Sequence, residues 1–290
     1  MSQHLLVRTV PDLAGRLMLS ETLLCPACGF RLQFDSSGAR RCCTQPGGST
    51  LEDSIICYEP DFRSDKPEVK ARDNEAHGYL AHSKFPIQIY RLECFVRRVS
   101  AERGSLPVLD LGCGPGPATQ ILLDAGFSVV GVDFSLQSLR LNAQRSNCRQ
   151  DRVQFVQADL TRIKFAHACA GGLMMADFLQ HLGDRATQRS FLDQALMALK
   201  PGGWFFLSFL NTNVKNRLKG DNEGFYSGGT IPYRRLTIHE VIGMLPQNVE
   251  VTEVLPMNIF HSVCPDRFVA RLPLARLLAR WMIIYGRRTV

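Results

Sequence analysis

The sequence predicts an α/β fold in which one mostly parallel sheet carries helices on both faces. Two observations support this prediction. Strand-like apolar runs alternate with helix-like segments from Leu106 onward, and a glycine-rich turn, "GCGPG", directly follows the first strand. Strands that alternate with helices favour parallel pairing, and such sheets bind ligands beyond the carboxyl ends of their strands.

The alternation predicts the elements in order. The expected strands are residues 106–111, 128–132, 153–157, 172–175, 204–210, 249–254 and 280–286, and the expected helices are residues 117–125, 137–145, 186–199 and 237–244. Gly126 follows the first helix, as glycine commonly does at helix ends. Thr237 with Glu240 has the pattern of a capping box.

The chain divides into three predicted parts. Residues 1–65, rich in Cys, Gly and Ser, suggest a small cysteine ribbon-like module, and residues 105–290 contain the α/β domain. Residues 66–104 begin polar and then become amphipathic, which predicts a helical linker or lid. The apolar positions of that segment are Phe85, Ile87, Ile89, Leu92, Phe95, Val96 and Val99.

Composition indicates an ordinary globular protein, with 45% hydrophobic and 21% charged residues among 290. No apolar run approaches the ~18 residues of a membrane span, and no secretory signal precedes the first predicted elements, so a cytoplasmic location is expected. The ten cysteines are then expected to be reduced. The net charge of +7 permits a phosphate-rich partner without requiring one.

The glycine-rich turn differs from two common phosphate-binding motifs. Gly112, Gly114 and Gly116 do not have the spacing of a dinucleotide-binding loop, and no Lys-Ser/Thr pair ends the turn as in a phosphate loop. Asp110 stands just before the turn, where a carboxylate would repel pyrophosphate and attract a cation such as an amino group. The turn is therefore predicted to hold an amino-acid tail.

Two further acids end the next two strands. Asp133 in "GVDFS" is placed to accept hydrogen bonds from ribose hydroxyls, and Asp159 in "VQADL" is placed to accept from the adenine amino group. Together with Asp110 they describe a pocket for adenosine plus an amino-acid tail.

These motifs resemble the class I S-adenosylmethionine-dependent methyltransferases. The motifs are "VLDLGCGPG", "GVDFS", "ADL", "MMADFLQHL" and "ALKPGGWFFLSF", which match in order and spacing. The resemblance implies a Rossmann-like, seven-stranded methyltransferase sheet and S-adenosyl-L-methionine as cofactor. It implies these cofactor-binding residues: Asp110, Gly112, Gly114, Gly116, Asp133, Phe134, Asp159 and Leu160.

Substrate-side residues are predicted from three segments. His181 in "MMADFLQHL" is the candidate general base, since that segment faces the transferred methyl group in the family; a loop-ordering or cofactor-contacting role is the alternative. Tyr79 and His82 belong to the predicted lid. Tyr226 and Tyr233 belong to a long polar segment after the fifth strand, which commonly shapes the acceptor site in the family.

Cysteines in the first part suggest a structural zinc site. Cys25 and Cys28 have the spacing of a zinc knuckle, and Cys42 and Cys57 are the candidate third and fourth ligands. The adjacent Cys43 departs from the usual second pair, so a ribbon that has lost its metal is the alternative.

The expected function is methylation of a small molecule at O, N or C, the acceptor being a natural product, a lipid or quinone-like. A second reading is a ribosomal RNA guanine methyltransferase that docks through the zinc ribbon, although residues 1–65 have few of the interleaved basic and aromatic residues that RNA binding needs. A third is a partner protein that binds the cofactor without turnover, and a more remote one is aminopropyl transfer, as in spermidine synthases. The oligomeric state is not specified.

The end of the chain is rich in arginine. From Arg267 to Arg288 there are six arginines and no acid. A basic amphipathic helix can contact a membrane surface or an anionic substrate. Because Pro273 interrupts the helical pattern, a surface helix leading into the last strand is the favoured interpretation.

Overall fold

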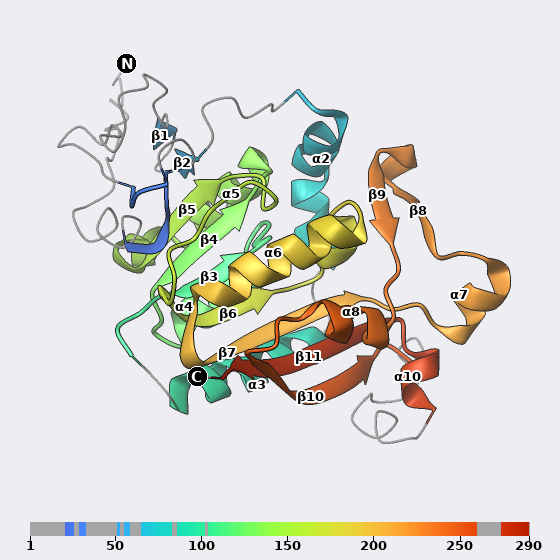
Figure 1. Ribbon diagram of the computed structural model, residues 1–290. Helices are drawn as coiled ribbons and strands as arrows, with labels where there is room; N and C mark the ends of the chain where they lie inside the picture. Colours follow the sequence, from blue (N-terminus) through green and yellow to red (C-terminus); the bar gives the residue numbers. More distant parts are fainter. Residues whose placement is uncertain are drawn as a thin grey trace, which may run out of the picture.

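The computed structural model describes residues 21–25, 29–32, 51–52, 55–58, 65–82, 86–101, 104–259 and 274–289. A single large sheet crosses the molecule, with strands in the order β1-β2-β5-β4-β3-β6-β7-β11-β10 (Figure 1). The strands are β1 (Leu51–Glu52), β2 (Ile55–Cys57), β3 (Val108–Leu111), β4 (Val129–Asp133), β5 (Val153–Gln157), β6 (Ala170–Met175), β7 (Leu199–Leu210), β10 (Val249–Met257) and β11 (Trp281–Arg288). The strands from β2 to β7 are parallel, and β1, β11 and β10 pair antiparallel.

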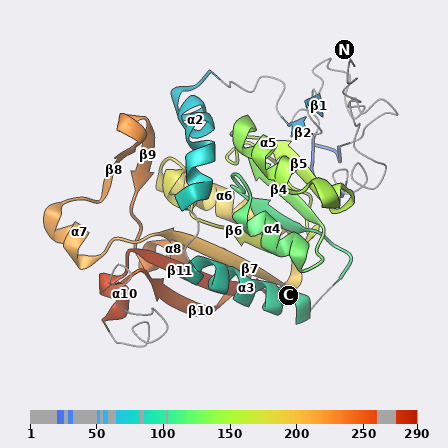
Figure 2. The same ribbon diagram turned by 180° about the vertical axis from the view of Figure 1, so that it is seen from behind.

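Helices cover both faces of the sheet, as the alternation predicts. Figure 1 shows α6 (Arg185–Ala198) and α8 (Ile238–Met244) on the near face. Figure 2 shows α3 (Pro86–Ala101), α4 (Pro117–Asp124) and α5 (Leu136–Arg145) on the opposite face. The remaining elements are α2 (Pro67–His82), α7 (Val214–Lys219), β8 (Glu223–Tyr226), β9 (Ile231–Arg234), α10 (Ala275–Leu278) and short 3₁₀ helices at Asn147–Arg152, Leu179–His181 and Ser227–Gly229.

The sheet is wider than the seven strands expected. All seven predicted strands are present, but β1 and β2 from the N-terminal part extend the sheet beyond β5, so that it contains nine strands. Ile55 and Ile56 of β2 are both fully buried, one in each of the two hydrophobic cores that flank the sheet. An apolar pair that is buried on both faces joins a parallel sheet readily.

The N-terminal part packs against the α/β domain. Its described apolar residues Leu23, Leu32 and Tyr58 are buried in the same core as the inner face of α6. The Tyr58 hydroxyl donates to the Leu24 carbonyl at 2.6 Å and accepts from the Lys164 amide at 3.1 Å. The segment is thus fastened to the domain by both apolar contacts and a buried hydroxyl with two partners.

The predicted helix ends agree with the structure to within about one residue. Thr237 and Glu240 form the predicted capping box, with the Glu240 side chain accepting from the Thr237 amide at 2.7 Å. The helix predicted to end at residue 199 ends at Ala198, because Leu199 already pairs with Ala170 and begins β7. The two helices of the predicted lid are α2 and α3.

Helix α2 lies across the carboxyl ends of the parallel strands, next to α5 (Figure 1). Asp73 of α2 accepts hydrogen bonds from the Ser135 hydroxyl at 2.6 Å and the Gln137 amide at 3.0 Å. The Asp73 carboxylate therefore caps the first turn of α5 from outside and holds α2 over the edge of the sheet where ligands of this fold bind.

Candidate active site

A cavity of about 330 Å³ opens at the carboxyl ends of the parallel strands, beneath α2. Acidic residues face it from successive strand ends: Asp159 after β5, Asp133 at the end of β4 and Asp110 in β3. Apolar residues face it from the neighbouring strands: Phe206 of β7, Ile283 of β11 and Met257 of β10. The cavity therefore has a polar half and an apolar half that follow the strand order.

The glycine turn approaches the cavity closely. Gly112 has φ +70°, and a Cβ there would lie 2.7 Å from the Phe178 ring, so only glycine fits. Gly114 has φ +51° and no atom within 4 Å of an added Cβ, because it faces open space. Both residues line the cavity.

Gly116 was predicted with the cofactor set, but it does not line the cavity. It is the N-cap of α4 at φ +96°, and an added Cβ would collide with the Asn142 side chain. Its conformation and its contact with α5 account for the third glycine of the motif.

Asp110 is 1% exposed, and its carboxylate accepts from the Thr119 hydroxyl at 2.6 Å. Burial raises the pKa of Asp110 to about 7, with the Thr119 hydrogen bond opposing the shift and the charge of Asp133 adding to it. No described cation forms an ion pair with Asp110. A buried carboxylate of this kind ionises fully only when a positive group approaches it.

Asp133 connects the glycine turn to the end of β4. One carboxylate oxygen accepts from the Gly114 amide at 2.9 Å, and the other accepts from the Ser135 amide at 2.9 Å. Burial still raises the Asp133 pKa, although these bonds and the charge of Arg72 oppose the shift. Each oxygen keeps acceptor capacity for a ligand hydroxyl.

The remaining predicted cofactor residues, Phe134, Asp159 and Leu160, also line the cavity. Asp159 accepts from the amide and hydroxyl of Thr161 at 2.9 and 2.7 Å, and Lys66 lies 3.9 Å away. The structure thus brings together all of the predicted cofactor residues except Gly116.

Two arginines of the cavity wall were missed by sequence reasoning. Arg91 of α3 is only 8% exposed, and its Nε has no hydrogen-bond partner. Within the described residues, no acid or carbonyl accepts from its guanidinium. Arg72 of α2 also lines the cavity, and its charge acts on Asp133, Glu68 and His181. A buried guanidinium without an acceptor is costly unless a ligand supplies one.

Asp177 is a further residue that sequence reasoning missed, although it lies in the quoted "MMADFLQHL" segment. It follows β6 with φ +59°, a strained conformation for a residue other than glycine. The Ser208 hydroxyl donates to its carboxylate, and burial raises the Asp177 pKa to about 6. Both side chains line the cavity.

His181 lines the cavity from the 3₁₀ turn that follows Asp177. Its Nδ1 lies 2.7 Å from the Pro232 carbonyl, which requires the proton to sit on Nδ1, and its Nε2 lies 3.4 Å from the Gln180 amide nitrogen. Burial, and then the charge of Arg72, lower the His181 pKa to about 4, against the opposing Pro232 bond. The imidazole is therefore neutral at neutral pH.

The predicted substrate-side tyrosines divide between two places. Tyr79 of α2 lines the cavity and keeps 47% of its surface exposed; desolvation of its hydroxyl and the charge of Asp177 raise its pKa, so it remains a phenol. Tyr226 and Tyr233 do not line the cavity: they stack on each other at 4.3 Å, and Tyr226 packs edge-on against His181. The His82 side chain lies outside the described residues.

The predicted zinc site is only partly described. Cys25 is buried at a tight turn in which the Gly29 amide donates to its carbonyl at 2.9 Å, and Cys57 lies on β2. Cys28 and Cys42 lie outside the described residues. Among the residues that are described, no cluster of three or more His, Cys, Asp or Glu side chains is arranged to hold a metal.

Comparison with known proteins agrees with the geometry. Residues 109–207 match the family model of a methyltransferase domain. The ubiquinone biosynthesis O-methyltransferase of Leptothrix cholodnii is 28% identical over 150 residues, which are 50% of this chain and 60% of that protein. The enzyme of the same name from Idiomarina loihiensis is 36% identical over 116 residues, which are 39% and 46%. This chain therefore matches about half the length of these relatives.

A solved structure shows the same fold. The 1,6-didemethyltoxoflavin-N1-methyltransferase of Burkholderia thailandensis, with bound 1,6-didemethyltoxoflavin and S-adenosylhomocysteine, superposes with a TM-score of 0.51 at 19% identity over 76% of this chain and 87% of that one. None of the described helices has the length and hydrophobicity of a membrane-spanning segment. The superposition shows that the chain has the class I methyltransferase fold, and residues 109–207 match a methyltransferase domain.

Proposed function

We propose that the protein transfers a methyl group from S-adenosylmethionine to a hydroxyl oxygen of a small, largely apolar acceptor, such as a quinone-like phenol. One observation carries the proposal. A single cavity joins the acidic strand ends of β3, β4 and β5 to an apolar half formed by β7, β10 and β11, and His181 lies in its wall. The relatives named for ubiquinone biosynthesis support the choice of acceptor class.

The cofactor is assigned along the strand order. Asp159 and Leu160 would meet the adenine, Asp133 the ribose hydroxyls, and Gly112 and Gly114 the amino-acid tail. The open space over Gly114 leaves room for a ligand against the main chain. Asp110, buried and without a cationic partner among the described residues, would bind the amino group of the tail.

Arg91 supplies the opposite charge that the tail needs. An amino-acid tail carries a carboxylate, and Arg91 brings a buried guanidinium with an unsatisfied Nε to the same cavity. A planar guanidinium pairs well with a carboxylate because two parallel hydrogen bonds form. The buried acids and the buried arginine thus fit an ammonium and a carboxylate on one ligand.

When bound, S-adenosylmethionine supplies a methyl group on a cationic sulfur, and transfer of that group is an in-line displacement. The chain provides alignment and exclusion of water, both of which lower the barrier. Phe206, Met257 and Ile283 would hold the apolar body of the acceptor.

His181 is assigned to the acceptor hydroxyl. With its proton held on Nδ1 by the Pro232 carbonyl, Nε2 is the nitrogen that can accept the hydroxyl proton as the new O–C bond forms. The contact with Gln180 at 3.4 Å is long enough to be exchanged for a shorter one with substrate.

The proposal is tested with S-adenosylmethionine labelled on the methyl group. The full chain is incubated with it and a cell extract, and label is counted in the solvent-soluble fraction and in precipitated RNA. Label in the solvent fraction supports the proposal and allows the product to be identified by mass spectrometry. Label in RNA would replace it with an RNA methyltransferase. Binding without transfer to either fraction would indicate a cofactor-binding partner protein.

A further inference from the structure

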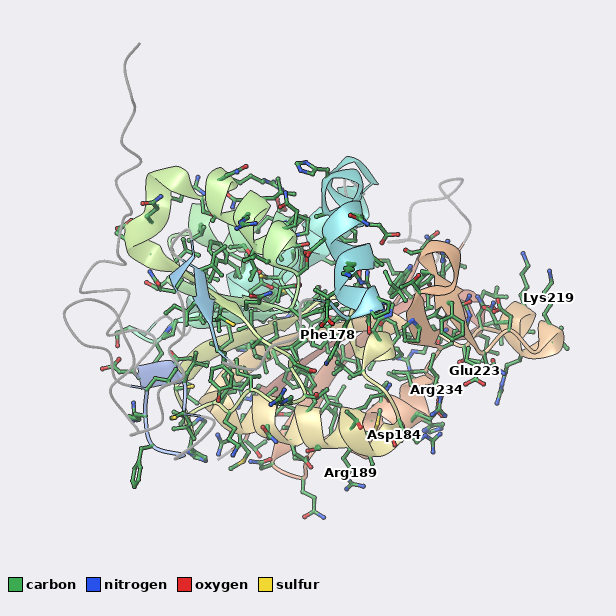
Figure 3. All side chains as sticks on the ribbon, turned by 90° about the horizontal axis from the view of Figure 1, so that it is seen from above. Phe178, Asp184, Arg189, Lys219, Glu223 and Arg234 are labelled. Atoms are coloured by element: carbon green, nitrogen blue, oxygen red, sulfur yellow. The ribbon has the colours of Figure 1, made fainter. Side chains whose placement is uncertain are left out.

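Arg72 of α2 brings an unpaired guanidinium to the cavity. Its half-buried side chain lines the cavity, and it forms no ion pair or hydrogen bond with any other residue that the structure describes. Figure 3 shows α2 beside the centre of the molecule, where Phe178 of the same cavity lies. The next residue, Asp73, fastens this turn of α2 to Ser135 and Gln137 of α5. The helix therefore holds the Arg72 guanidinium over the cavity, where a ligand can reach it.

The charge of Arg72 acts on groups at both sides of the place of methyl transfer. It acts on Asp133, which is assigned to the ribose, and on His181, which is assigned to the acceptor hydroxyl. It also acts on the Tyr79 hydroxyl, which lines the cavity from the same helix. These contacts indicate that Arg72 faces the space between the cofactor and the acceptor hydroxyl.

His181 alone is a weak base for a phenol. Its pKa of about 4 lies about six pH units below the pKa of an ordinary phenol, so proton transfer between them is unfavourable by about a million-fold. A cation beside the phenol oxygen reduces this difference, because it stabilises the anion that the departing proton leaves behind. The proposed reaction therefore needs a cation at the acceptor oxygen.

We propose that Arg72 binds the acceptor oxygen in its anionic form and thereby selects acceptors with an acidic hydroxyl, which are phenols rather than alcohols. A guanidinium suits this task because it stays charged and donates several hydrogen bonds. The inference rests on the proposed function, since it concerns the acceptor of the same reaction.

The reaction is balanced in atoms and charge. The hydroxyl proton passes to Nε2 of His181, and the phenolate oxygen forms the new bond to the methyl carbon. The electron pair of the broken carbon–sulfur bond stays on the sulfur, so the phenolate and the sulfonium both become neutral. His181 then releases its proton to solvent, and Arg72 remains a cation throughout.

Other ionisable groups line the cavity around Arg72 and bear on any titration there. They are Glu68, Glu75 and Tyr79 of α2, Asp133 at the end of β4, and Asp177 and His181 after β6. Burial raises the Asp177 pKa to about 6, so this carboxyl gains its charge close to neutral pH. Because all of these groups are kept in the variants below, comparing the variants at each pH removes their contribution.

Binding of para-nitrophenol to the full chain loaded with S-adenosylhomocysteine tests the inference. The absorbance of this phenol reports its ionisation, so its pKa can be measured both free and bound. The unaltered protein is expected to lower the pKa of the bound phenol by about one pH unit or more, which is a tenfold preference for the phenolate. Arg72→Met is expected to abolish this change and to weaken phenolate binding at least about tenfold. Arg72→Lys keeps the charge and is expected to retain part of the effect.

A matched ligand and a matched variant separate charge from shape. The methyl ether para-nitroanisole cannot ionise, so the unaltered protein and Arg72→Met are expected to bind it equally. Lys70→Met removes an exposed cation of the same helix that does not line the cavity, and it is expected to leave phenolate binding unchanged. Calorimetric affinity for S-adenosylhomocysteine is expected to be similar in all variants, which shows that they are folded.

Three results would overturn the inference. The first is that the unaltered protein binds no para-nitrophenol or does not lower its pKa. The second is that Arg72→Met loses para-nitroanisole as strongly as para-nitrophenol. The third is an equally large loss of S-adenosylhomocysteine affinity in Arg72→Met, which would assign Arg72 to the cofactor. Failure to transfer a methyl group in the labelling experiment would contradict the proposed function and leave the measured preference for the phenolate standing.

Discussion

Asp110 is assigned to ligand binding, but its buried carboxylate lowers the stability of the ligand-free protein. Its pKa in the folded protein is about 7, whereas its ordinary value is 3.8. A carboxyl with a raised pKa binds more protons in the folded state, so its contribution to stability is fully present below about pH 4 and is lost as the pH rises through about 7. At neutral pH the empty site therefore carries a buried charge that destabilises the fold.

Asp110→Asn is expected to raise the free energy of unfolding of the ligand-free protein at pH 7 by roughly 1–4 kcal/mol, because the buried charge is removed. The same change is expected to lower affinity for S-adenosylmethionine at least about tenfold, because the ammonium loses its partner. Thermal unfolding and calorimetry measure the two effects. The exposed Asp151→Asn is the control and should change neither. Loss of stability together with unchanged affinity would contradict the assignment.

Arg91 is assigned to the carboxylate of the cofactor tail, and its removal should report that contact. Arg91→Met is expected to weaken S-adenosylhomocysteine binding about 10- to 100-fold, the usual range for a charged hydrogen bond. Arg98→Met is the matched control on the same helix, since Arg98 pairs with Glu253 at 2.6 Å and does not line the cavity. Equal losses in the two variants, measured by calorimetry, would show that α3 acts only as a structural support.

Among the structural elements, the turn between β3 and α4 is predicted to leave space for the ligand next to its main chain. Gly114 and Gly220 have similar φ values, +51° and +68°, and an added Cβ meets nothing within 4 Å at either position. Gly114→Ala and Gly220→Ala should therefore lose similar stability, roughly 1 kcal/mol, from backbone strain. Only Gly114→Ala is expected to weaken S-adenosylhomocysteine binding, at least severalfold, because its methyl group enters the ligand space. Calorimetry of both variants measures their affinities for S-adenosylhomocysteine. Equal affinities would refute the placement of the amino-acid tail of the cofactor next to Gly114.

The packing of α2 on α5 is predicted to support cofactor binding. Asp73→Ala removes the acceptor of the Ser135 and Gln137 bonds, and it is expected to cost about 1 kcal/mol of stability and to lower cofactor affinity severalfold. Asp184→Ala removes the N-cap of α6, which accepts from the Thr187 amide at 2.9 Å. It should cost similar stability and leave affinity unchanged, so thermal unfolding and calorimetry of the pair isolate the contribution of α2. An equal effect on affinity would contradict a lid role for α2.

At the scale of the whole molecule, sequence pattern predicted the parallel sheet, its seven core strands and most of the polar half of the cavity. These features follow from local signals, since apolar runs, helix periodicity and strand-end acids are all visible within a few residues. The strands β1 and β2 were missed because two or three residues carry no periodicity of their own, and only pairing with β5 makes β2 a strand.

The sequence pattern could not distinguish the roles of Gly114 and Gly116, and it could not show that Arg91 is buried. Gly114 and Gly116 look alike in the motif, yet one faces the ligand space and the other faces Asn142. Arg91 lies in a helical stretch where arginine is ordinarily a solvated residue, and its lack of an acceptor appears only when α3 is packed against the sheet. These distinctions depend on contacts between segments that are distant along the chain.

The strand-end acids are assigned to S-adenosylmethionine, and Asp133 is the acid whose removal should affect binding the most. The measurement is calorimetric titration of S-adenosylhomocysteine into the full chain and into Asp133→Ala, with thermal unfolding to show that both are folded. We expect saturable binding by the unaltered protein and a loss of affinity of about 100-fold or more in the variant, since Asp133 is assigned to the ribose and also accepts from the Gly114 amide of the glycine turn. Absence of binding by the folded protein, or equal affinity in the variant, would contradict the assignment of the cofactor to these acids.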